Sequence, residues 1–259
     1  MSINTKQSIS DSLEVDPLLL PHIPFLLQDL WALGSSVDLI IDVLKPLNLE
    51  ASQTTALDLG CGKGAVSVQL TLQFGFHVLG IDAMLPFLED AITKARSYNV
   101  THLCKFEQQD IHKYILDDHQ FDIVIFASLG GLLGTFQETI GKVRHQVRHG
   151  GYIIIDDGYL KKGDRFHRKR YEHYRNHSET IRELTTFGDC ILNEISTTEL
   201  SELINKEYLQ AIEKRGRELV ACKPELKSFV DEYVSLQVEE CQVIAEKIEG
   251  ALWLIQKTS

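Results

Sequence analysis

Between Thr55 and Asp157 the sequence alternates between apolar runs of strand length and stretches with helical spacing, and this alternation restricts the fold more than any other feature. Runs that are apolar throughout are typical of strands covered on both faces of a parallel sheet. Such strands are joined by right-handed crossovers, which place helices on both faces. The sequence therefore predicts an α/β fold with a doubly wound, mostly parallel sheet. The strand-length runs in this region are TALDLG, HVLGID, CKFEQQD, FDIVIFAS and YIIIDD.

Beyond Asp157 the alternation stops, and two more strand-length runs, GDCILNEIS and ALWLIQK, are separated by two long amphipathic patterns. They bring the predicted sheet to seven strands. The connection between them far exceeds the usual hairpin loop of about two to five residues, so we expect a helical insertion that forms a lid over the ligand cleft. The predicted division is an N-terminal helical cover at 1–50, a Rossmann-like domain at 51–195 and 250–259, and a helical insertion at 196–249.

Composition and charge exclude several classes of function. A net charge of −11 argues against nucleic acid as a partner, because that binding depends mainly on Lys and Arg neutralising phosphates. No apolar run reaches the roughly 18 residues of a membrane-spanning helix, and the polar N-terminus lacks the apolar core of a signal peptide. The five cysteines are scattered and odd in number, which predicts neither a disulfide framework nor a metal site. These features favour a cytoplasmic location and leave the oligomeric state open.

The first strand runs directly into three alternating glycines, Gly60, Gly62 and Gly64, and then into a helical pattern. Glycine is used where the backbone needs unusual dihedral angles or where a ligand approaches the main chain closely. The next strand ends in Asp82, eighteen residues after Gly64, where a carboxylate can accept hydrogen bonds from a ribose diol. The loop and the acid together predict a nucleotide-like ligand at the carboxyl ends of the strands. A tight turn without a ligand is the simpler alternative.

Two better-known glycine loops do not match this one. The dinucleotide fingerprint requires G-x-G-x-x-G, whereas here Ala65 follows the third glycine, and the phosphate loop of nucleotide triphosphatases requires Ser or Thr after Gly-Lys. Lys63 is therefore expected to be a solvated loop residue. Cys61 is expected to be a small packing residue rather than a nucleophile.

The ordered set LDLGCGKG, GID, QQDI, FDIVIFAS and GGYIIIDD, spread over about residues 55–158, resembles the successive motifs of class I S-adenosylmethionine-dependent methyltransferases. The closing ALWLIQK is similar to the last strand of that family, which runs antiparallel to the others. The resemblance implies a Rossmann-like methyltransferase of the small-molecule type that uses S-adenosylmethionine. Members that methylate DNA amines carry Asn/Asp-Pro-Pro-Tyr/Phe after the fourth strand, where this chain has ASLGG, so attack by a base amine is not supported.

The same resemblance implies the residues that bind the cofactor. The glycine loop would hold the methionine end, the end of the second strand the ribose, the end of the third strand the adenine, and the end of the fourth strand the sulfonium. The implied residues are Asp58, Gly60 and Gly62 (with Cys61 in the same loop), Asp82, Ala83, Met84, Asp110, Ile111, Ala127 and Ser128.

The implied reaction needs little from the protein beyond positioning. A sulfonium methyl is already activated, so transfer is an in-line displacement in which nucleophile, methyl and sulfur are held collinear. A general base is needed only where the nucleophile arrives protonated. The catalytic residues are therefore not predicted beyond three candidates after the fifth strand, with further bases nearby at Asp156, Tyr171 and His173. The three candidates are Asp157, Tyr159 and His167.

Residues 161–182 form a basic segment, with eight Lys or Arg against three Asp or Glu. Arg165, Arg168 and Arg175 could hold an anionic group of the acceptor by bidentate pairing. The alternative is that these cations pair with acidic helices nearby, and that the histidines of RFHRKRYEHYRNH belong to a polar helix surface. Two other functions remain open from the sequence: an NAD(P)-dependent oxidoreductase of Rossmann type, and a non-catalytic module that binds S-adenosylmethionine.

Overall fold

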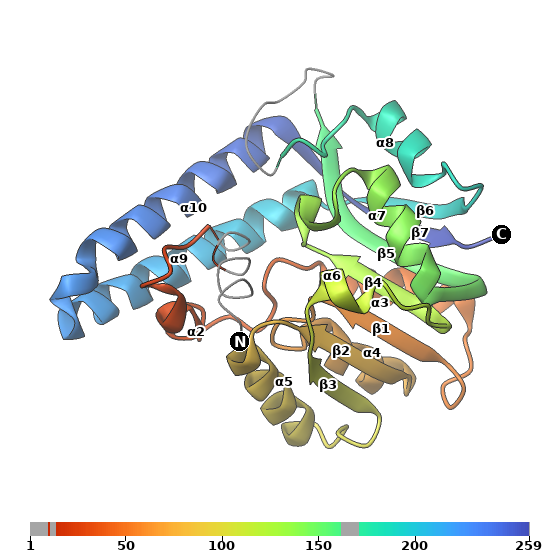
Figure 1. The fold of residues 1–259 in the computed structure, drawn as a ribbon, viewed down its shortest axis with the longest axis horizontal. Helices are drawn as coiled ribbons and strands as arrows, with labels where there is room; N and C mark the ends of the chain where they lie inside the picture. Colours follow the sequence, from red (N-terminus) through yellow and green to blue (C-terminus); the bar gives the residue numbers. More distant parts are fainter. Residues whose placement is uncertain (1–9, 11–13, 162–170, 259) are drawn as a thin grey trace. The chain divides into compact units, whose positions relative to one another are not determined.

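The computed structural model describes residue 10 and residues 14–161 and 171–258 of the chain, which divides into two compact units (Figure 1). The sheet unit runs from Ala32 to Thr198 and resumes at Ile248. The helical unit consists of the described residues up to Trp31 together with Glu199–Lys247. Each unit therefore combines segments that are distant in the sequence.

The sheet unit is built on seven strands in the order β3-β2-β1-β4-β5-β7-β6. β1 to β5 pair in parallel, and β7 runs antiparallel between β5 and β6. This arrangement confirms the predicted doubly wound α/β fold and its antiparallel last strand. The strands are β1 (Thr55–Leu59), β2 (His77–Asp82), β3 (Cys104–Gln108), β4 (Phe121–Ala127), β5 (Val147–Leu160), β6 (Cys190–Ser196) and β7 (Ile248–Gln256).

The central strands are buried on both faces, as their uninterrupted apolar runs predict. Residues 56–59 of β1 and residues 153–156 of β5 are all buried. On β7, Trp253 is fully buried and meets the Phe136 ring edge-on at 5.7 Å between ring centroids. Burying each large apolar side chain contributes roughly 1.5–3 kcal/mol, so the core around β1, β4, β5 and β7 holds the sheet unit together.

Helices cover the sheet on either side of the point where the strand order reverses, between β1 and β4. α4 and α5 belong to the crossovers on one side of β1, and α6 and α7 to those on the other, which places a ligand edge at the carboxyl ends of these strands. The helices of this unit are α3 (Val37–Leu44), α4 (Ala65–Phe74), α5 (Leu85–Ser97), α6 (Ile111–Tyr114), α7 (Phe136–Val143) and α8 (His177–Leu184). Its short 3-10 helices are η2 (Lys45–Leu47), η3 (Gly130–Leu133) and η4 (Arg144–Gln146).

The helical unit is a long hairpin of α9 (Thr198–Cys222) and α10 (Lys227–Lys247), joined by η5 (Pro224–Leu226), together with η1 (Leu20–His22) and α2 (Ile23–Leu26) (Figure 1). The two long helices approach closely at Gly216, where a Cβ atom would lie 2.8 Å from a methyl group of Val230. The Tyr208 hydroxyl lies 2.7 Å from that of Tyr233. Asp29 joins the N-terminal segment to α9 through an ion pair with Lys214 at 3.1 Å.

The boundaries differ slightly from those expected. The helices of the predicted insertion occupy residues 198–247, and β7 begins at Ile248 rather than at residue 250. Residues 32–50, which include α3, belong to the sheet unit and not with the N-terminal helices before them. In the part of the chain that the structure describes, no helix has the length and apolar content needed to span a membrane.

Candidate functional site

The loop between β1 and α4 has a backbone that only glycine adopts readily. Gly60, Gly62 and Gly64 have positive φ angles of +67°, +52° and +73°. Space is equally restrictive, because a Cβ atom at Gly60 would lie 2.6 Å from the Leu129 side chain and one at Gly64 would lie 2.8 Å from the Cβ of Ala91. Backbone geometry and packing therefore both require glycine in this loop.

Asp82, the last residue of β2, is bound to the glycine loop. One of its carboxylate oxygens accepts a hydrogen bond from the Gly62 N–H at 2.9 Å, and the other accepts one from the Met84 N–H at 2.7 Å. Burial raises the pKa of Asp82, while these backbone donors act in the opposite direction. The carboxylate is thereby oriented at the ligand edge, and each oxygen keeps a lone pair that can accept from a diol.

Asp58 is enclosed near the end of β1. It is 3% exposed, and its carboxylate accepts a hydrogen bond from the Ser67 hydroxyl at 2.6 Å. Burial raises the pKa of Asp58 to about 7, and the nearby charge of Asp82 adds to the shift. A cation bound beside Asp58 would lower this pKa again, because an opposite charge favours the carboxylate. The position is therefore suited to an ammonium group.

The expectation that Lys63 is solvated is wrong. Lys63 is 3% exposed, its ammonium group lies 3.3 Å from the Asp90 carboxylate, and it sits 5.9 Å from the centroid of the Phe87 ring. A long cationic side chain can be buried where an acid and an aromatic face receive it, and α5 supplies both. Cys61 is buried as expected for a packing residue, and burial raises the pKa of its thiol, which keeps it protonated.

The residues implied for ribose and adenine lie together because β2 and β3 are neighbours. The Gln109 N–H donates to the Asp82 carbonyl at 3.0 Å. The Asp110 carboxylate caps the N-terminus of α6 by accepting a backbone N–H at 3.0 Å. Met84 and Ile111 are both buried and apolar. The residues that share this edge are Asp82, Ala83, Met84, Asp110 and Ile111.

The end of β4 lies against β5. Ala127 is the last residue of β4, and Ser128 follows with a positive φ of 56°. The Ser128 N–H donates to the Asp156 carbonyl at 2.9 Å, and the Asp156 carboxylate accepts the Ser36 N–H at 2.7 Å. Burial raises the pKa of Asp156 to about 6. Asp156 therefore braces the backbone before α3.

Residues 33 and 34 meet the predicted site, although the sequence analysis did not single them out. The Leu33 side chain lies 3.2 Å from where a Cβ atom of Gly62 would be, and a Cβ atom on Gly34 would lie 3.3 Å from that of Ser128. This short stretch therefore touches both the glycine loop and the end of β4. Its sequence shows no motif that could have revealed the contact, because the contact joins segments far apart in the chain.

Asp157 points to the opposite face of the sheet from Asp156, since the two are consecutive in a strand. Its carboxylate accepts the Tyr174 hydroxyl at 2.7 Å and lies 3.4 Å from Nε2 of His173. His173 is 5% exposed. The expectation that it belongs to a polar helix surface is wrong, because residues 171–176 are not helical and buried Tyr171 lies within the same stretch.

The remaining candidates for a catalytic or acceptor-binding role are either in contact with other side chains of the protein or outside the described residues. The Tyr159 ring packs against His177 and Trp253, with ring centroids 4.7 Å and 6.4 Å away. Burial also raises the pKa of Tyr159, so its hydroxyl keeps its proton. Arg175 lies 3.3 Å from the Glu183 carboxylate, which agrees with the alternative that the basic segment pairs with acids. His167, Arg165 and Arg168 lie outside the described residues.

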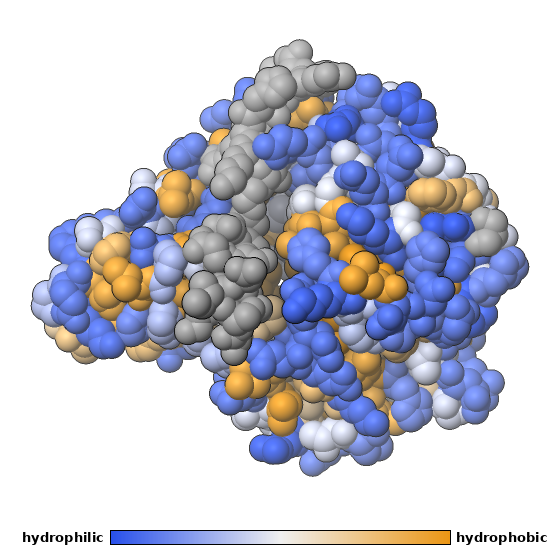
Figure 2. Space-filling view, in the orientation of Figure 1, coloured by the Kyte–Doolittle hydropathy of each residue, from blue (hydrophilic) through white to orange (hydrophobic). Residues whose placement is uncertain are grey.

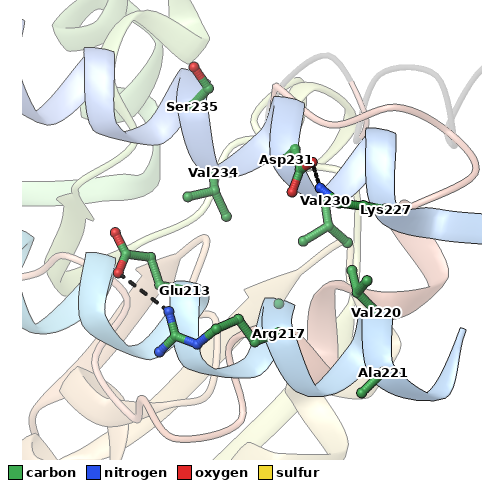
Figure 3. Close-up of a pocket in the computed structure, with 10 residues that line it drawn as sticks. Glu213, Arg217, Val220, Ala221, Lys227, Val230, Asp231, Val234 and Ser235 are labelled. Atoms are coloured by element: carbon green, nitrogen blue, oxygen red, sulfur yellow. Dashed lines mark hydrogen bonds and ion pairs between the residues drawn. The ribbon is translucent and has the colours of Figure 1, made fainter. Parts of the chain in front are cut away.

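A groove with a volume of about 630 Å³ lies in the helical unit between α9 and α10 (Figure 3). Val220, Val230 and Val234 line it, and its charged residues pair with one another, Lys227 with Asp231 and Glu213 with Arg217. Figure 2 shows apolar side chains on this unit near the connection between the two helices. Over residues 14–161 and 171–258, no cluster of three or more His, Cys, Asp or Glu could hold a metal ion.

Comparison with known proteins assigns most of this chain to a family. A family model described as a methyltransferase domain matches residues 50–217. A crystal structure of an S-adenosylmethionine-dependent methyltransferase from Geobacter sulfurreducens, in complex with S-adenosylhomocysteine, superposes with a TM-score of 0.77 at 17% identity, covering 90% of this chain and 96% of that one. A similar complex from Thiobacillus denitrificans gives 0.75 at 19% identity, with the same coverage. At these identities the two structures show the shared fold.

Two curated proteins extend the comparison. This chain is 32% identical over 108 residues to a ubiquinone biosynthesis O-methyltransferase of Rickettsia akari (strain Hartford), which covers 42% of this chain and 41% of that protein. It is 22% identical over 173 residues to phosphoethanolamine N-methyltransferase 1 of Zea mays. That match covers 67% of this chain and 34% of that protein. The matched region thus spans less than half the length of either relative.

Proposed function

The chain belongs to the methyltransferase domain family, and we propose that it transfers the methyl group of S-adenosylmethionine to a small-molecule acceptor. The family match confirms the predicted resemblance to class I methyltransferases, and it leaves the oxidoreductase alternative without support. The observation that carries the proposal is the hydrogen bond from the Gly62 N–H to Asp82, which joins the glycine loop to the acid at the switch in strand order.

The roles proposed for the cofactor residues follow their positions along the strand edge. Asp58, with its raised pKa, receives the ammonium group of the methionine end. Asp82 accepts the ribose hydroxyls with the lone pairs that its two backbone donors leave. Asp110 accepts the adenine amine, and Met84 and Ile111 supply the apolar faces that contact the ring. The remaining proposed contacts are the backbone of Gly60, Cys61 and Gly62, Ala83, and the end of β4 at Ala127 and Ser128.

The proposed mechanism depends on positioning. S-adenosylmethionine supplies a methyl group that is already activated by its sulfonium. The protein holds the acceptor in line with the bond that breaks and keeps water away, and such positioning can supply about 7–11 kcal/mol of the barrier. The rigid glycine loop and the strand end at Ala127 and Ser128 provide two fixed sides of that geometry.

A small-molecule acceptor is supported by two observations. The curated relatives are named for ubiquinone biosynthesis and for phosphoethanolamine, both of which concern small molecules. The chain itself carries a net charge of −11, which opposes binding to nucleic acid.

Calorimetry with S-adenosylhomocysteine tests the cofactor, with NAD as the control ligand. Binding of the first and not of the second is expected, together with a rise in melting temperature. Release of S-adenosylhomocysteine in the presence of candidate acceptors then distinguishes an enzyme from a module that only binds. NAD binding without S-adenosylhomocysteine binding would contradict the proposal.

A further inference from the structure

His173 is a buried imidazole whose nitrogens are not used by the protein. It is 5% exposed, and among the described residues neither Nδ1 nor Nε2 has a hydrogen-bond partner. Nε2 lies 3.4 Å from an Asp157 oxygen, close enough for charge interaction but too poorly aligned for a hydrogen bond. Buried polar groups in proteins are nearly always bonded, so this one is suited to a partner that binds beside it.

The imidazole lies next to the end of β4. Its Cε1 atom is 3.8 Å from where a Cβ atom of Gly130 would be, and Gly130 is two residues beyond Ser128. Asp157 follows Asp156 in β5, and the Asp156 carbonyl accepts the Ser128 N–H. His173 therefore lies beside the segment that follows the end of β4, where the proposed function puts the sulfonium.

We propose that His173, positioned by Asp157, is the general base of this methyltransferase, and that the acceptor is a hydroxyl group on an aromatic ring. The proposal rests on the proposed function. Small adjustment of the ring lets Asp157 accept the Nε2–H, which fixes the tautomer and leaves the lone pair of Nδ1 for the acceptor.

The step is balanced in atoms and charge. The hydroxyl proton passes to Nδ1 while the hydroxyl oxygen forms a bond to the methyl carbon. The bond between that carbon and sulfur breaks, and its electron pair goes to the sulfur, which becomes a neutral thioether. The products are the methyl ether, S-adenosylhomocysteine and a His173 imidazolium that the Asp157 carboxylate stabilises.

The surroundings of His173 favour a neutral aromatic hydroxyl over an amine. The Phe136 ring meets the imidazole edge-on at 5.7 Å, and the Tyr174 ring lies 4.0 Å away. An acceptor that reaches the imidazole would meet these rings, and a flat ring packs well against them. An amine acceptor would arrive as an ammonium ion beside the sulfonium. Accumulating cations in a buried site is costly, whereas a phenol brings no charge.

The test uses the full chain with S-adenosylmethionine and two probe acceptors, catechol and 4-nitrocatechol, whose hydroxyl ionises more readily. His173→Ala should lower kcat for catechol by roughly 10²–10⁴-fold, the usual contribution of a general base. The loss should be clearly smaller for 4-nitrocatechol, which needs less help in losing its proton. Asp157→Asn should lower kcat for both catechols, as His173→Ala does. The affinity for S-adenosylhomocysteine should stay within about twofold in both variants, because neither residue is among the proposed contacts of the cofactor.

The chain offers a matched control in a second His–Asp pair. His145 Nδ1 lies 3.1 Å from Asp118, and both side chains are mostly exposed before the starts of β5 and β4. His145→Asn should therefore leave both rates unchanged. A loss in His173→Ala that is equal for the two catechols would overturn the base role and leave a packing role.

A measurement on the unaltered protein covers the case in which His173→Ala does not fold. In the complex with S-adenosylhomocysteine, added catechol should shift the imidazole ¹⁵N resonances of His173. Methylation of phosphoethanolamine but of neither catechol would overturn the inference, and so would an absence of both catechol turnover and a ¹⁵N shift. Failure of S-adenosylhomocysteine to bind at all would instead count against the proposed function.

Discussion

The two halves of the strand edge are held together in different ways. In the half proposed for the cofactor, at the ends of β1 to β3, the hydrogen bonds join residues that are close in the sequence, such as Ser67 with Asp58 and Gly62 with Asp82, which are 9 and 20 residues apart. In the half proposed for the acceptor, at the ends of β4 and β5, Ser36 reaches Asp156 across 120 residues, while Tyr174 reaches Asp157 across 17.

The two halves are therefore suited to different ligands. The cofactor half is a rigid local structure in which glycine backbone and carboxylates already bond to one another. The acceptor half contains a buried imidazole that the protein leaves without a hydrogen bond. A constant ligand suits the first arrangement, and a variable one suits the second. Each of the following variants tests this difference between the cofactor half and the acceptor half.

Gly64→Ala should have the largest effect, because it attacks the rigidity of the cofactor half. A left-handed backbone costs an alanine about 1–2 kcal/mol, and overpacking costs about 1–3 kcal/mol more. The sum predicts a loss of about 2–5 kcal/mol in the free energy of unfolding, measured by urea denaturation. Gly188→Ala is the matched control, since Gly188 has a φ of +84° but no atom within 4 Å of its Cβ position. Equal losses in the two variants would show that packing around Gly64 is unimportant.

The pH dependence of stability should reveal the buried carboxylate of Asp58. Its folded pKa is about 7, above the ordinary value of 3.8, so the folded state binds more protons than the unfolded state between about pH 4 and pH 7. The free energy of unfolding of the unliganded protein should therefore fall as the pH rises through this window, by roughly 2–4 kcal/mol from this group.

Asp58→Asn should reduce that fall, because the amide does not ionise and its oxygen can still accept from Ser67. Urea denaturation at several pH values measures the effect, with Asp118→Asn as an exposed control. A slope that is the same in Asp58→Asn and in the unaltered protein would contradict the assignment.

Asp82→Ala should weaken binding of S-adenosylhomocysteine by roughly 1.5–3 kcal/mol, or about 10- to 100-fold, the worth of hydrogen bonds to a charged acceptor. Calorimetry measures the dissociation constant, and Asp118→Ala serves as the control. The Asp157→Asn variant in the acceptor half should leave the same constant unchanged. An unaltered constant in Asp82→Ala would mean that Asp82 only braces the loop.

Arg175→Ala should have the smallest effect and bears on the acceptor half. The guanidinium lies 3.3 Å from Glu183 and donates to the Tyr174 carbonyl at 3.0 Å, so it is already engaged within the protein. We expect the KM for the acceptor to change less than about twofold, as for other partly exposed ion pairs. A several-fold rise in KM at unchanged cofactor affinity would instead assign Arg175 to an anionic group of the acceptor.

The sequence by itself determined the fold, and it predicted the residues of the cofactor half of the site. Uninterrupted apolar runs require strands with two covered faces, and helices between them require parallel pairing. The positions of the loop glycines and of Asp82 could be predicted from the same pattern, because each lies at the end of a strand whose position the pattern already defines. All seven predicted strands are present, and α4 occupies residues 65–74, where its apolar spacing predicts it.

Only the tertiary structure decided which polar side chains are buried. Lys63 lies in the glycine loop and His173 in a polar stretch, and the sequence analysis placed both on the surface. Their burial depends on partners from other segments, Asp90 on α5 for the lysine and Asp157 on β5 for the histidine. A polar group is tolerated inside a protein when folding brings it a partner or a ligand, and that condition concerns distances in space, which the spacing of residues along the chain does not contain.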